Sequence, residues 1–212
     1  MGPTSLFYNP SNDYVYVADE GAGFGHVVSL INGTMVVGTV GVGTGPASFV
    51  YDNASEDVYV VNSLDNTVSV IRGTANIANV SLGFQPSVLV YDPDNQYVYA
   101  PNVYAPNVYG NNVSVISGTE VIANLVTGIM PSRALYDPSN GDVYVSNSGT
   151  YGICAGGCPM EPSDVVSVIG GTSVLENVTS GSDPGALLYN PSDHSVFVIA
   201  REEVTVVAPI GS

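Results

Sequence analysis

Short runs of alternating apolar residues dominate the chain and predict β-strands. In residues 57–62, Val58 and Val60 fall on one face of an extended strand, and Tyr59 and Val61 fall on the other. Turn-forming Asp, Asn, Gly and Pro separate such runs. No segment shows the sustained 3.6-residue period of a helix. The pattern therefore predicts an all-β protein.

The strand pattern repeats along the chain. The segment 91–99, which begins Tyr91-Asp92-Pro93, resembles 136–144, and further copies begin at Tyr8, Tyr51 and Tyr189. Each copy has a proline five residues before this tyrosine and an aromatic residue eight positions after it. The copies are 43, 40, 45 and 53 residues apart. We expect one domain of five repeats, at approximately 2–43, 44–83, 84–128, 129–181 and 182–212.

Each repeat is predicted to contain four antiparallel strands. In the second repeat the expected strands are 47–51, 57–62, 66–71 and 76–82. The fifth repeat stops after its third strand, Val204 to Val207. Four strands at this period are typical of a β-propeller blade, because a lone sheet with two apolar faces is buried by stacking against others. A β-sandwich also uses short strands, but it gives no reason for five copies of one motif.

Two arrangements of the five blades are compatible with the repeats. We expect a closed or nearly closed five-blade ring whose last blade has three strands. The alternative is a fragment of a larger propeller, which would leave an apolar blade face exposed. Such a face would favour a homo-oligomer formed through the incomplete terminal blade.

The repeats resemble the YVTN-type β-propeller family of archaeal and bacterial surface-layer and secreted proteins. The matching residues are Tyr59-Val60-Val61-Asn62 followed by Asn66-Thr67-Val68-Ser69-Val70-Ile71, with similar segments at 99–102 and 112–116, and at 144–147 and 166–169. The first repeat departs at Asp19 and the fifth at Arg201. The resemblance implies a propeller fold and an extracellular or cell-surface protein that acts as a scaffold, adhesion or binding module.

The charge of the chain excludes two classes of partner. Nineteen acidic residues face only Arg72, Arg133 and Arg201, which gives a formal net charge of −16. No basic patch exists to bind nucleic acid or an anionic membrane surface. The sequence contains no run of 18 apolar residues, so no membrane-spanning segment is predicted. We therefore expect a protein or a glycan as partner.

Loops that vary in length between repeats are the expected place for recognition. The third repeat inserts residues 103–110, beside which Asn102, Tyr104, Asn107 and Tyr109 are candidate binding residues. Tyrosine offers a rigid amphipathic surface, and asparagine both donates and accepts hydrogen bonds, which suits sugars or a protein. The alternative is that these tyrosines pack against the neighbouring loop.

Arg133 lies two residues after a repeat proline, where other repeats have Ser5, Ser48, Val88 and Ala186. This position begins the innermost strand of the blade, which faces the central channel of a propeller. The cation is therefore expected at the mouth of that channel. There it would hold an anionic ligand or pair with one of the many carboxylates.

The fourth repeat inserts the longest loop, 148–163, which contains Cys154 and Cys158. A local disulfide between them is expected. Three residues separate the cysteines, whereas a redox motif has two, and no histidine that could be a further metal ligand lies nearby in the sequence.

No catalytic motif is found, and no cofactor is expected, although calcium would suit scattered acids such as Asp19 with Glu20, or Glu161 with Asp164. The expected function is non-catalytic recognition. The alternative is a propeller hydrolase or lyase that uses these carboxylates or a bound calcium.

Overall fold

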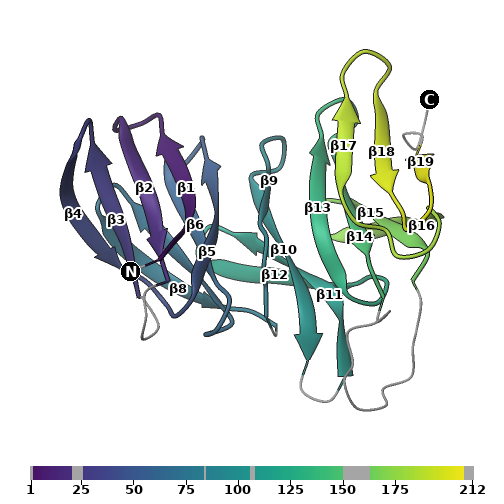
Figure 1. The fold of residues 1–212 in the computed structure, drawn as a ribbon, viewed down its shortest axis with the longest axis horizontal. Helices are drawn as coiled ribbons and strands as arrows, with labels where there is room; N and C mark the ends of the chain where they lie inside the picture. Colours follow the sequence, from purple (N-terminus) through teal and green to yellow (C-terminus); the bar gives the residue numbers. More distant parts are fainter. Residues whose placement is uncertain (1, 21–25, 84, 106–107, 150–162, 208–212) are drawn as a thin grey trace.

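Five antiparallel sheets follow one another along the chain in a computed structural model that describes residues 2–20, 26–83, 85–105, 108–149 and 163–207 (Figure 1). The first blade contains β1 (Pro3–Asn9), β2 (Tyr14–Asp19), β3 (Val27–Asn32) and β4 (Met35–Gly41). The second contains β5 (Pro46–Asp52), β6 (Asp57–Asn62), β7 (Thr67–Arg72) and β8 (Ala75–Ser81). The third contains β9 (Val90–Asp92), β10 (Tyr97–Ala105), β11 (Val108–Ser117) and β12 (Glu120–Val126).

The last two blades differ in the number of strands. The fourth contains β13 (Pro131–Asp137), β14 (Asp142–Asn147), β15 (Val165–Gly170) and β16 (Ser173–Thr179). The fifth contains β17 (Leu187–Asn190), β18 (Ser195–Ile199) and β19 (Val204–Val207). Strands pair in sequence order within every sheet. The five-blade β-propeller and its three-stranded last blade are confirmed.

Apolar clusters between successive blades form the core. Between the third and fourth blades, Tyr99, Val113 and Val115 pack against Val143 and Ile169, and all five side chains are fully buried. Equivalent clusters join the other neighbouring blades. Because both faces of an internal sheet are covered, near-continuous apolar strands such as β6 are buried along their whole length.

A tyrosine of the second strand joins each of the first three blades to the next one. Its hydroxyl donates a hydrogen bond to the carbonyl oxygen of the glycine in the following blade's β3–β4-type turn. The bonds are Tyr16 to Gly73 at 2.6 Å, Tyr59 to Gly118 at 3.0 Å and Tyr99 to Gly171 at 2.9 Å. The recurring aromatic residue and Gly-Thr turn therefore meet at each of these three blade boundaries.

The recurring Tyr-Asp-Pro turn is held by its own acidic or amide side chain. Asp92 Oδ1 accepts the backbone N–H of Asp94 at 2.9 Å, and Asp137 Oδ1 accepts that of Ser139 at 2.8 Å. Asp52 does the same with Ala54 at 2.8 Å. This side-chain-to-backbone bond explains why Asp or Asn ends each innermost strand.

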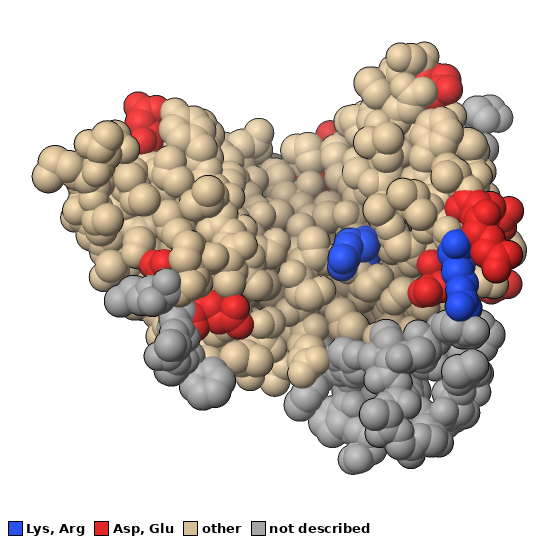
Figure 2. Space-filling model, in the orientation of Figure 1, with Lys and Arg blue, Asp and Glu red and all other residues tan. Residues whose placement is uncertain are grey.

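The first and fifth blades lie at opposite ends of the molecule (Figure 1, and Figure 2 in the same orientation). Extended contacts between blades link each one to the next in sequence, and among the described residues none links the fifth blade back to the first. The expected closed ring is therefore wrong for this part of the chain, and the blades form an open arc. The repeats specify how neighbouring blades pack, but they leave the number needed for closure open.

The first residue of the second strand is a buried aspartate in both the second and the fourth blade, but its surroundings differ. In the second blade, Asp57 accepts two hydrogen bonds from Arg72, both at 2.8 Å. In the fourth blade the equivalent Asp142 lies beside Gly170 instead, next to the pair formed by Val143 and Ile169. Burial, followed by the charges of Asp137 and Asp92, raises the pKa of Asp142.

Asp142→Asn is therefore expected to raise the melting temperature by a few degrees at pH 7. Between the ordinary carboxyl pKa and the raised pKa of the folded state, the folded chain holds a proton that the unfolded chain has released. The stability of the unmodified chain therefore falls as pH rises through the folded pKa of Asp142. The advantage of the variant should vanish below the ordinary carboxyl pKa. Asp57→Asn, which loses an ion pair, should instead lower the melting temperature at pH 7. Thermal unfolding from pH 3 to 8 measures both, and equal effects of the two substitutions would contradict this account.

Candidate functional site

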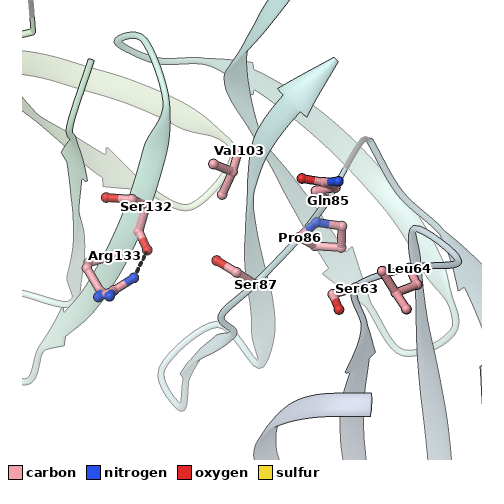
Figure 3. Close-up of a pocket in the computed structure, with 8 residues that line it drawn as sticks. All are labelled: Ser63, Leu64, Gln85, Pro86, Ser87, Val103, Ser132 and Arg133. Carbon is pink, nitrogen blue, oxygen red and sulfur yellow. Dashed lines mark hydrogen bonds between the residues drawn. The ribbon is translucent and has the colours of Figure 1, made fainter. Parts of the chain in front are cut away.

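A small pocket lies among the second, third and fourth blades (Figure 3). Its volume is about 310 Å³, within the range of small-molecule sites. It is lined by Ser63, Leu64, Gln85, Pro86, Ser87, Val103, Ser132 and Arg133. These residues come from the β6–β7 turn, the connection from the second to the third blade, β10 and the start of β13. The pocket is therefore on the end of the propeller where those connections meet.

The backbone before four of the five repeat prolines has a left-handed conformation that shapes this end. Gln85 has φ of 49° and Met130 has φ of 56°, as do the equivalent Gly45 at 70° and Asp183 at 58°. The Gln85 N–H is held by Asn66 Oδ1 at 2.8 Å. The turn directs the chain into the innermost strand, so the residues after the proline line the pocket.

A bulge at the start of β13 places Arg133. Pro131 pairs with Asn147 but Arg133 pairs with Ser146, so Ser132 is the extra residue of the strand. Bulges re-aim side chains in this way and are frequent beside functional sites. Arg133 Nη1 donates a hydrogen bond to the Ser132 carbonyl oxygen at 2.8 Å (Figure 3). Two neighbouring residues are thereby turned toward one pocket.

The lining combines one cation with neutral hydrogen-bonding groups. Arg133 is the only charged side chain of the eight. Within the described ranges it pairs with no carboxylate, so the expected ion pair is not observed there. Ser63, Ser87 and Ser132 add hydroxyl groups and Gln85 an amide, while Leu64 and Val103 supply apolar surface. This set suits a small ligand that carries a negative charge, hydroxyl groups and an apolar face.

The candidate residues of the third repeat are arranged differently from the expected loop. β10 and β11 continue as a hairpin in which the backbones of Tyr104 and Tyr109 lie opposite each other. Asn107 lies outside the described residues. The β-forming residues of the insertion, Val103 to Tyr104 and Val108 to Tyr109, extend the ladder, which a length comparison alone does not predict.

Asn102 is fully buried within its blade. Its Nδ2 donates to Asn112 Oδ1 at 2.6 Å and to Ser114 Oγ at 2.9 Å. Equivalent bonds join Asn62 to Ser69 at 2.9 Å and Asn147 to Ser167 at 3.0 Å. We therefore assign Asn102 a part in holding strands together and leave it out of the pocket.

Sequence reasoning identified Arg133 but not the serines and Gln85 that surround it. Ser63 belongs to the shortest of the loops that join the second and third strands of a blade. Loop length gave no reason to choose it, because this loop has no insertion. The available signal was the position next to each repeat proline, since Gln85, Ser87 and Ser132 all flank Pro86 or Pro131.

The other candidate chemistry has little support from the described residues. Cys154, Cys158 and Glu161 lie outside them, so the disulfide stays a prediction. Asp19 is buried and accepts the Ser29 hydroxyl at 2.5 Å, while Asp164 is exposed. Across the described ranges, no group of three acidic, histidine or cysteine residues is arranged to hold a metal ion. No helix in the same ranges could span a membrane.

The stacked blades and the pocket at one end define a β-propeller with a small pocket that contains one cation. Solved structures with the same fold include the hydrazine synthase of Kuenenia stuttgartiensis, with a TM-score of 0.72 and 20% identity. They also include virginiamycin B lyase from Staphylococcus aureus, with a TM-score of 0.68 and 13% identity, and the dihydro-heme d1 dehydrogenase NirN, with 0.66 and 12%. At these identities the similarity establishes the fold alone.

The chain corresponds to only part of these longer propeller proteins. The matches cover 93%, 97% and 97% of this chain but 55%, 69% and 46% of the hydrazine synthase, lyase and NirN chains respectively. No protein-family model matches the sequence, and no curated protein matches it either.

Proposed function

We propose that the chain is a recognition module that binds an acidic sugar, such as a uronic acid unit of a glycan, in the pocket beside Arg133. The observation that carries this proposal is a single guanidinium in a pocket whose other polar groups are neutral. Arg presents paired N–H donors that match a carboxylate, and such charge-assisted bonds are among the stronger ones in proteins.

The neutral lining supports a sugar rather than a simple anion. Serine hydroxyls and the Gln85 amide both donate and accept, as sugar hydroxyl groups require. Leu64, Pro86 and Val103 offer apolar contacts for the C–H groups of a pyranose ring. A volume of about 310 Å³ is at the lower end for ligand pockets, which fits one monosaccharide unit.

The composition of the pocket favours binding over acid–base catalysis. Arg133 is its only ionisable side chain, and a guanidinium does not release its proton in proteins. We also infer that the repeats are of the YVTN type and that the module works outside the cell or on its surface. The Tyr-Val-x-Asn and Asn-x-Val-x-Val-Ile segments support both inferences.

Titration with D-glucuronate, followed by NMR chemical shifts at 0.15 M salt, tests the proposal. At this ionic strength, exposed charges farther apart than about 8 Å are largely screened, so the net charge of −16 does not mask a local site. We expect shifts at residues around Arg133 and weaker binding of D-glucose. Arg133→Gln should weaken glucuronate binding by about 10- to 100-fold, as loss of a charged hydrogen bond implies.

The matched control is Arg72→Gln, because Arg72 is paired with Asp57 in the second blade and does not line the pocket. It should bind glucuronate as the unmodified chain does. Equal binding by the Arg133 and Arg72 variants, or no glucuronate binding at all, would contradict the proposal.

A second candidate function is a propeller enzyme of the hydrolase or lyase class. The similar structures are named as a synthase, a dehydrogenase and a lyase, which supports this alternative at the level of fold. It would use carboxylates such as Asp19 and Asp164, or a bound calcium. The NMR titration separates the two candidates when it is repeated with an oligouronide over a day, because a recognition module leaves the sugar unchanged.

A further inference from the structure

Every blade has two apolar faces with different residues. The leading face is the one toward the preceding blade, and the trailing face is the one toward the following blade. At the boundary between the fourth and fifth blades, the trailing face contributes Leu135, Tyr144, Val166 and Val168. The leading face contributes Leu187, Tyr189, Val196 and Val198. The two faces fit each other but are not alike.

The leading face of the first blade is uncovered. Leu6 and Tyr8 occupy the positions of Leu187 and Tyr189, because Leu6 pairs with Val17 as Leu187 pairs with Val198. Their relative exposures are 69% and 55%, and Val36 on the same face is 65% exposed. Among the described residues, no other blade packs on this face.

In the described part of the chain, no blade covers the trailing face of the fifth blade either. Leu188, Phe197 and Val206 occupy the positions of Leu135, Tyr144 and Val168, as the strand registers show. Leu188 is 65% exposed and Val206 is 53% exposed, whereas Tyr144 and Val168 are fully buried at the preceding boundary. Val204 and Ile199 extend this face and are 62% and 56% exposed.

We propose that a second copy of this chain covers these faces, with the trailing face of its fifth blade on the leading face of the first blade. The contact would continue the boundary that joins successive blades within the chain. Large apolar faces are rare on the surface of monomers and mark interaction sites.

A second copy is the occupant that supplies the missing counterpart to both faces. Each copy carries one leading and one trailing face, so the contact is heterologous and extends to a ring or a filament. At two of the four internal boundaries, a leading-face tyrosine also donates to the preceding blade's turn. Tyr136 donates to Asp94 at 2.8 Å and Tyr91 to Asp52 at 2.6 Å.

Sedimentation velocity of the full chain over a range of concentrations tests the proposal. The unmodified chain should associate as concentration rises, beyond its 21.9 kDa monomer mass. Val206→Asp and Leu6→Asp should each give a monomer, because each places a charge on one face of every contact. Both side chains are largely exposed, so neither charge enters the core. The control is Val126→Asp, a 71% exposed position on neither face, which should associate normally.

Mixing the two variants gives the sharpest result. An equimolar mixture of Val206→Asp and Leu6→Asp chains retains one intact trailing face and one intact leading face, so it should form a two-chain particle and stop there. The proposal is overturned if the unmodified chain stays monomeric up to about 1 mM, a concentration at which contacts worth about 4 kcal/mol are populated. It is also overturned if Val206→Asp alone still associates, or if the mixture remains monomeric.

Discussion

Tyr99→Ala is expected to lower the free energy of unfolding by about 3–5 kcal/mol, the range for removing a buried aromatic side chain. Tyr99 is fully buried between the third and fourth blades, against Val143 and Val145. Its loss leaves a cavity at the boundary, because the sheets on both sides are held by their own hydrogen bonds. For a chain of this size the melting temperature should fall by roughly 6–20 °C. Urea and thermal denaturation measure the effect.

Tyr99→Phe is the control that separates packing from hydrogen bonding. It keeps the ring but removes the bond of 2.9 Å to the Gly171 carbonyl oxygen, so we expect a loss of about 1 kcal/mol. If Tyr99→Ala costs no more than Tyr99→Phe, the blades do not pack through this side chain.

Gly128→Ala is expected to lower the free energy of unfolding by about 1–3 kcal/mol through overpacking. A Cβ atom at this position would lie 2.7 Å from Asn147 Cγ and 2.9 Å from Val165 Cγ2. Asn147 cannot yield easily, because its Nδ2 donates to two carbonyl oxygens and to Ser167 Oγ. The same close approach recurs at Gly43 and Gly83, each with its Cβ position 2.8 Å from the equivalent asparagine.

Gly38→Ala provides the comparison in a strand without this constraint. A Cβ atom there has no neighbour within 4 Å, so its substitution should leave stability unchanged or slightly raise it. Denaturation of both variants under the same conditions measures the difference. Indistinguishable midpoints for the two would mean that the glycine-to-asparagine contact is not part of the folded state.

The blades could be predicted well from the sequence because the repeats share the same local pattern of proline, apolar strand and turn residues. The second-repeat strands agree with the prediction within one residue at every end, and the second strand, Asp57–Asn62, agrees at both ends. The alternation of Val58, Tyr59, Val60 and Val61 identified a sheet buried on both faces. The proline and the tyrosine five residues after it appear in all five repeats, so a chance match in one repeat does not mislead.

The arc and the pocket could not be predicted in the same way. Closure depends on small rotations summed over all the blades, and local alternation carries no information about that sum. The pocket joins Ser63, Gln85 and Arg133 from three blades, and none of them belongs to an insertion. Loop length directed attention to Tyr104 and Tyr109 instead. Asn102 illustrates a related difficulty, because a buried asparagine and a ligand-binding one look alike in sequence.

A crystal structure of the 212-residue chain tests the central proposition most directly, which is that successive blades pack face to face through a repeated tyrosine. We predict five sheets related by rotation, with the hydroxyls of Tyr16, Tyr59 and Tyr99 bonded to glycine carbonyl oxygens of the following blade. Two layered sheets without that rotation, or tyrosines that stay within their own sheet, would contradict it.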